Sequence, residues 1–145
     1  MQDDVAPGRP PGDTPLSEIP MDVTSISIQV ASSDPQRLFS FYRDVVQLTP
    51  QPEMGQAFAL GPAGHLHIVE HSAVSGAAKE PARAILDLHV GNIDAEHARL
   101  EAAGVTFSRS KGVEFWGGII STFADPDGNI VQLIEHRPEL AREEN

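Results

Sequence analysis

Apolar and polar residues alternate strictly in TSISIQV, residues 24–30, the first patterned stretch of the chain. Ile26, Ile28 and Val30 share one face of an extended segment, while serine and glutamine side chains occupy the other. A period of two predicts a β-strand that buries one of its faces.

A helix is predicted directly after this strand. Asp34 followed by Pro35 is typical of a helix start, because the carboxylate accepts from a free N–H group and proline needs no donor in the first turn. Apolar residues then recur at helical spacing and form one stripe: Leu38, Phe41, Tyr42, Val45 and Val46. We expect this helix to cover the apolar face of the strand.

The same order of elements returns in the second half of the chain. AILDLHV, residues 84–90, alternates again, and NIDAEHARLEAAGV follows as a predicted helix with Asn92 or Asp94 as its cap and Gly104 as its end. Further short strands are predicted at 56–61 and 65–71, and at 105–109, 117–124 and 129–135. Strand, helix and several strands therefore form an internal repeat.

The repeat sets the predicted domain organisation. Module one spans about 22–72 and module two about 83–136, inside a single domain over 21–137. Residues 1–20 contain five prolines and no periodic apolar pattern, so we expect a disordered or loosely attached tail. Residues 138–145 form a polar C-terminal tail.

The strand faces opposite the helices are too polar for a closed core. Unpaired polar groups in a dry interior cost about 1–3 kcal/mol each. We therefore expect these faces of the two sheets to line one wet, concave site. The side chains on them are Ser25, Ser27, Gln29, His65, His67, His71, Asp87, His89 and Gln132.

Composition narrows the partners of this site. The 145 residues carry a net charge of −11, which argues against nucleic acid and favours a cationic ligand. Cysteine is absent, so disulfides and thiolate chemistry are excluded. No apolar run suits a membrane span, and the N-terminus lacks the apolar core of a signal peptide. We expect a cytoplasmic protein that contacts no membrane.

Three segments resemble the vicinal oxygen chelate superfamily, which includes glyoxalase I, extradiol dioxygenases, and fosfomycin- and bleomycin-resistance proteins. They are FYRDVVQL (41–48), ARLEAAGV (98–105) and FADPDGNIVQLIE (123–135), and the resemblance covers about 22–136. It implies an α+β fold of two βαβββ modules, whose curved mixed sheets surround a cleft, and a homodimer. The DPDGN turn is interpreted as a strand connection rather than a ligand contact.

The resemblance also implies where metal ligands would lie in this sequence. The four positions of the metal-dependent members fall on Ser25, His67, Ile85 and Gln132. Isoleucine cannot coordinate an ion and a serine hydroxyl is a poor ligand, whereas three protein ligands are the usual minimum at a catalytic site. We therefore expect no metal and no other cofactor. The alternative is a divalent ion on His67 and Gln132.

A rearranged metal site is a further alternative. His65 and His67 are two residues apart on one strand face, about 6–7 Å from each other, and His89 or Asp87 would complete the ligand set. His97, on the second helix, and His136, in the tail, are interpreted as surface residues.

Three classes of function remain open. The first is a binding protein that sequesters a small molecule, as bleomycin-resistance proteins do, with Trp116 stacking on an aromatic ligand. The second is a metal-independent enzyme, a glyoxalase-like lyase or isomerase, in which His67, Asp87 and His89 act as acid–base groups. The third is a metal-dependent lyase, isomerase or dioxygenase with altered ligands centred on His67. The remaining candidate substrate-binding residues are Ser25, Ser27, Gln29, His65 and Gln132.

Overall fold

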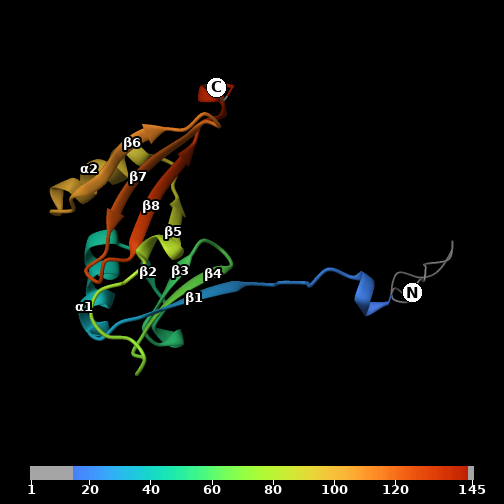
Figure 1. Ribbon diagram of the computed structural model, residues 1–145, viewed down its shortest axis with the longest axis vertical. Helices are drawn as coiled ribbons and strands as arrows, with labels where there is room; N and C mark the ends of the chain where they lie inside the picture. The colour runs from blue at the N-terminus through green and yellow to red at the C-terminus, as the bar shows by residue number, and fades with distance from the viewer. Residues whose placement is uncertain (1–14, 144–145) are drawn as a thin grey trace.

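The computed structural model describes residues 15–143, which form two separate four-stranded sheets (Figure 1). Sheet A has the strand order β1-β4-β3-β2 and sheet B the order β5-β8-β7-β6. In both, the first pair of that order is parallel and the others are antiparallel. The sheet A strands are β1 (Ile26–Ala31), β2 (Thr49–Pro50), β3 (Ala57–Leu60) and β4 (Gly64–Val69). The sheet B strands are β5 (Ile85–His89), β6 (Phe107–Val113), β7 (Gly118–Ala124) and β8 (Ile130–His136).

The two helices begin where the sequence places them. Helix α1 (Pro35–Ser40) continues as π-helical turns over Phe41–Val46 (η3), and α2 covers Ile93–Ala102. The Asp34 carboxylate accepts from the Arg37 N–H at 3.2 Å. Asn92, rather than Asp94, caps α2 by accepting from the Ala95 N–H at 3.1 Å. The predicted fold of two βαβββ modules is confirmed, and it includes the short strand β2, which has no clear sequence pattern.

The chain ends differ in how they are held. Residues 1–14 of the predicted N-terminal tail lie outside the described residues; Leu16–Glu18 forms a short 3-10 turn, and the segment that follows extends away from the sheets (Figure 1). At the other end Pro138–Leu140 forms a 3-10 turn, and the Arg142 N–H donates to the Phe115 carbonyl at 2.7 Å. Within residues 15–143, no helix combines the length and apolarity needed to cross a bilayer.

One hydrophobic core serves both modules. The buried cluster joins side chains of α1, η3 and sheet A to side chains of α2 and sheet B. Burial of this apolar surface is the main force that holds the modules together. The core residues are Leu38, Tyr42, Val46, Phe58, Leu66 and Ile68 from module one, and Ile93, Leu100, Ile119, Phe123, Val131 and Leu133 from module two.

The outer strand β1 departs from the prediction. Helix α1 was expected to cover its apolar face, but Ile26 is 62% exposed and Ile28 is 39% exposed. The inner strands of sheet A carry the fully buried residues Leu66 and Phe58 instead. β1 lies at the end of the strand order, whereas α1 packs on the neighbouring strand β4. The expectation is therefore wrong for Ile26 and Ile28.

A buried hydrogen bond links the two modules at the DPDGN turn. The Tyr42 hydroxyl, on η3, donates to Asp125 Oδ2 at 2.7 Å. The other carboxylate oxygen accepts from the backbone N–H groups of Asp127 at 2.9 Å and Asn129 at 3.0 Å. Burial, together with the negative charge of Asp125, raises the pKa of Tyr42 above its usual range. The turn does connect strands, as predicted, and it also fastens module two to the first helix.

The Tyr42–Asp125 bond predicts a loss of stability on substitution. Tyr42→Phe removes a hydrogen bond to a buried carboxylate and should lower the free energy of unfolding by about 1.5–3 kcal/mol, measured by urea denaturation. In a double-mutant cycle with Asp125→Asn, the two losses should be non-additive, because they remove one shared contact. Asp44→Asn, at an exposed carboxylate on the same turns, is the control and should change stability by less than about 0.5 kcal/mol. Additive losses would contradict the assignment.

Candidate functional site

Four polar side chains line up across the face of sheet B that points away from the core. Strand register pairs Asp87 with Gln132, Gln132 with Thr122, and Thr122 with Arg109. Paired residues on neighbouring strands share a face, and successive strands lie about 4.8 Å apart. The Gln132 amide donates to the Thr122 hydroxyl at 3.3 Å. We call Asp87, Gln132, Thr122 and Arg109 the polar row.

Arg109 reaches this face because β6 is irregular. The register shifts between Phe107 and Arg109 and again between Arg109 and Gly112. The first shift turns Arg109 away from the core side, where Phe107 packs, to the open face. Its guanidinium occupies the space that a side chain at Gly112 would need and pairs with Glu114 at 2.7 Å. Sequence alternation alone could not reveal a residue that a bulge moves from one face to the other.

Trp116 covers the end of the same face. A Cβ atom built on Gly118 would overlap its indole ring, so the absence of a side chain at Gly118 is what admits the ring. The indole lies 6.0 Å from the His136 ring, between centroids, and Trp116 is 39% exposed. An indole that packs against the sheet and stays partly exposed can stack on an aromatic ligand.

The polar face of sheet A carries the histidines. β1 pairs with β4 so that Ser27 lies beside His65 and Gln29 beside His67. The His65 and His67 rings are 6.4 Å apart, in the range expected for residues two apart on a strand. Ser25 precedes β1 and is exposed. His71 lies beyond β4, where its Nδ1 accepts from the Ala73 N–H at 3.0 Å.

The two polar faces do not meet within one chain. In each sheet, the face opposite to these polar side chains packs against the shared core. No hydrogen bond or ion pair in the described part of the chain joins the sheet A group to the polar row. Within one chain the two polar faces are therefore separate, and the expectation that they line one common site stays a prediction.

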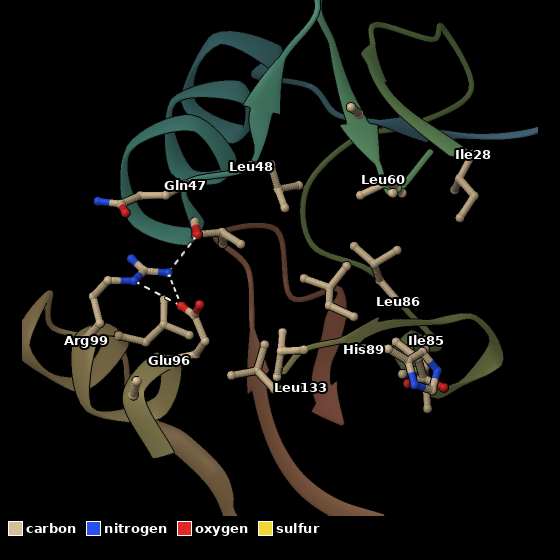
Figure 2. Close-up of a pocket in the computed structure, with 18 residues that line it drawn as sticks. Ile28, Gln47, Leu48, Leu60, Ile85, Leu86, His89, Glu96, Arg99 and Leu133 are labelled. Carbon is tan, nitrogen blue, oxygen red and sulfur yellow. Dashed lines mark hydrogen bonds and ion pairs between the residues drawn. The ribbon is translucent and has the colours of Figure 1, made fainter. Parts of the chain in front are cut away.

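A cavity of about 800 Å³ lies between the modules (Figure 2). Of the predicted site residues, only Asp87 and His89 line it. Its walls are otherwise mostly apolar: Ile28, Val46, Leu48, Leu60, Ile85, Leu86, Leu88, Leu100 and Leu133. Figure 2 shows His89 and Ile85 on one side of the view and Arg99 with Glu96 on the other.

Arg99 is a lining residue that the sequence reading missed. Its guanidinium donates to the carbonyls of Val45 at 2.8 Å and Val46 at 2.9 Å, and it pairs with Glu96 at 3.1 Å. These bonds satisfy carbonyls at the end of η3, so Arg99 joins the modules rather than reaching for a ligand. An arginine on a helix surface gives no sequence signal for such a contact.

The residues at the family metal positions do not fit a metal. Ile85 lies on the open face of sheet B beside Ile130, in the register that also pairs Asp87 with Gln132. An aliphatic side chain therefore occupies a position that would require a donor atom. Among residues 15–143, no three histidine, aspartate or glutamate side chains are grouped closely enough to hold an ion.

His97 is buried, not on the surface as predicted. Its ring stacks on Phe107 with centroids 3.8 Å apart, and its Nδ1 lies 2.8 Å from the Ser121 hydroxyl. That hydroxyl also accepts from the Lys111 N–H at 3.1 Å, and His97 Nε2 faces Glu101 at 3.4 Å. The contact holds the irregular strand β6 against α2.

Comparison with known proteins identifies the family. The model of the Glyoxalase/Bleomycin resistance protein/Dioxygenase superfamily matches residues 25–133. The chain therefore belongs to this superfamily, and the resemblance inferred from its motifs is confirmed. A search of curated protein sequences gave no significant match.

Solved structures show the same fold at low sequence identity. TnmS3, an antibiotic binding protein from Streptomyces sp. CB03234, is 24% identical with a TM-score of 0.62, covering 82% of this chain and 99% of its own. A glyoxalase/bleomycin resistance protein/dioxygenase from Nocardioides is 18% identical with a TM-score of 0.64, covering 88% and 91%. A superfamily member from Sphaerobacter thermophilus DSM 20745 is 20% identical with a TM-score of 0.62, covering 79% and 98%.

The packing of Trp116 on Gly118 predicts a spectroscopic change. Gly118→Ala should push the indole off the sheet into water and shift its fluorescence emission to longer wavelength. Trp116 is the only tryptophan of the chain, so the emission reports on this residue alone. Gly91→Ala, at a glycine with open space around it, is the matched control and should leave the spectrum unchanged. An unchanged spectrum in Gly118→Ala would place the ring elsewhere.

Proposed function

We propose that the protein binds a small organic molecule, without the family metal, in a cleft between sheet A of one copy and sheet B of a second copy. The observation that carries the proposal is the pair of exposed strand edges between the modules. Among residues 15–143, β1 pairs only with β4 and β5 only with β8. Both strands expose isoleucines: Ile26 and Ile28 on β1, and Ile85, which is 41% exposed, on β5.

A second copy would cover both edges at once. Free strand edges with apolar side chains are normally paired or covered in native proteins. In a two-fold dimer, β1 of each chain would lie near β5 of the other, because such an interface uses the same surfaces of both subunits. Sheet A of one chain and sheet B of the other would then form the two walls of each cleft.

The chemistry of these walls suits recognition by hydrogen bonds. Sheet A supplies the imidazoles of His65 and His67 with Ser27 and Gln29, and sheet B supplies the polar row with Trp116. A few polar groups fix the orientation of a ligand, and an aromatic surface adds contact area. Ser25, at the start of β1, would lie at the rim.

Binding is favoured over catalysis by the lack of an oriented base. In a general-base site, a third group holds the histidine in place. Neither His67 nor His89 has a side-chain hydrogen-bond partner in the described part of the chain, and Asp87 and His89 are neighbours on one strand face without a bond between them. The shared fold with TnmS3, described as antibiotic binding, supports capture of a small molecule. His67, Asp87 and His89 are thus proposed as binding groups.

The proposal predicts that dimerisation and ligand binding are lost together. Ile28→Asp places a charge on the proposed interface. In sedimentation, the parent protein should have the mass of two chains and the variant the mass of one. Compounds from a small-molecule library that raise the melting temperature of the parent protein should lose that effect in the variant. The metal content of the parent, purified without a histidine tag, should stay well below one equivalent per chain.

Val74→Asp provides the matched control, because Val74 is 37% exposed but belongs to the loop between β4 and β5 and to neither strand edge. It should remain dimeric and respond to the same compounds. A parent protein that sediments as a single chain, or a monomeric Ile28→Asp that keeps its ligand response, would refute the shared cleft.

A further inference from the structure

We infer that the polar row of sheet B recognises the cationic end of the ligand, with Asp87 and Gln132 as a pair of hydrogen-bond acceptors. The inference rests on the proposed function and names the chemical class of molecule that the cleft takes: an organic cation with N–H donors on a planar, apolar body.

Asp87 is the unpaired charge of the row. It is exposed, and no hydrogen bond or ion pair joins its carboxylate to another side chain in residues 15–143. Its direct neighbour in the parallel register of β5 and β8 is Gln132, on the same face and about 4.8 Å away. A group with two N–H donors can bridge acceptors at this separation.

The orientation of Gln132 makes its side chain an acceptor. Its Nε2 donates to the Thr122 hydroxyl, which lies on the side opposite to Asp87. One of the two N–H donors of the amide is thereby engaged, and the amide oxygen has no partner among the described residues. The Gln132 amide oxygen and the Asp87 carboxylate thus offer two acceptors side by side to a ligand donor.

The opposite end of the row is neutralised. Arg109 is paired with Glu114 at 2.7 Å, and its guanidinium is held over Gly112. The row as a whole is therefore anionic, with the uncompensated charge at Asp87. The net charge of −11 adds long-range attraction for a cation.

Apolar side chains flank the acceptor pair. Ile85 and Ile130 lie one pleat to one side of Asp87 and Gln132. Ile134, one pleat to the other side and beside His89, is buried. Trp116 covers the far end of the same face. A ligand whose cationic group meets the acceptors would lay its apolar body on the accessible residues Ile85, Ile130 and Trp116.

Three small probes of nearly the same shape test the inference: benzamidinium, benzamide and benzoate, titrated against the full chain and followed by Trp116 fluorescence and calorimetry. Benzamidinium should bind about tenfold or more tightly than benzamide, the scale expected of a charge-assisted hydrogen bond, and benzoate should bind weakest.

The variants should move this preference in opposite directions. Asp87→Asn should reduce the advantage of benzamidinium over benzamide to about twofold or less, and Gln132→Glu should increase it, because a second carboxylate replaces the amide oxygen. Glu53→Gln makes the same change in net charge as Asp87→Asn at an exposed site in module one and should leave the preference intact.

Several results would overturn the inference. They are a preference for benzoate, a benzamidinium advantage that survives Asp87→Asn, an equal loss in Glu53→Gln, or no saturable binding of benzamidinium. None of these results would contradict the proposed function. That proposal is tested by whether Ile28→Asp loses both the dimer and the rise in melting temperature with the library compounds. Failure of the proposed function would instead show in sedimentation, as a parent protein with the mass of a single chain, and this test needs no titration.

Discussion

The hydrogen bond from Tyr42 to Asp125 is the contact on which the arrangement of the two modules depends. It joins the turns after α1 to the loop that enters β8, and the same carboxylate also accepts from the backbone of that loop. A buried carboxylate is tolerated only where several donors satisfy it. Together with the Arg99 bonds to the Val45 and Val46 carbonyls, this bond favours one geometry between the modules. The apolar contact between Phe41 and Phe123 contributes stabilising energy with less directional preference.

This geometry decides where a ligand can bind. Much of the core side of each sheet is committed to the shared core, and the opposite, polar faces are separate within one chain. The apolar cavity between the modules opens beside the free edges of β1 and β5. On the proposed function, a second copy of the chain would cover the exposed isoleucines and complete the cleft that one copy leaves open.

The sequence predicted the elements well because their signals are local. Alternation around Ile28 and Leu88, the cap at Asp34 and the stop at Gly104 each depend on a few neighbouring residues, and all appear in the structure. The DPDGN turn was also predicted, but its bond to Tyr42 joins residues 83 positions apart and leaves no local trace.

The candidate site was harder to predict because it depends on tertiary packing. Alternation placed Asp87, His89 and Gln132 on one face correctly, since a regular strand preserves parity. It could not place Arg109, which two irregularities in β6 move to that face. His97 was misread because a histidine on a polar helix resembles a surface residue until Phe107 and Ser121 are brought against it. Nor could the pattern show that the faces of the two sheets would be separate.

Cross-linking between the two polar faces tests the central claim most directly. The chain has no cysteine, so the double variant Gln29→Cys, Thr122→Cys carries one thiol on each face. A bifunctional maleimide with a spacer of about 10 Å, two strand separations, should join Gln29→Cys of one chain to Thr122→Cys of another and give a covalent dimer on a denaturing gel. A product that is cross-linked only within single chains would show that one copy forms the cleft alone and would contradict the account.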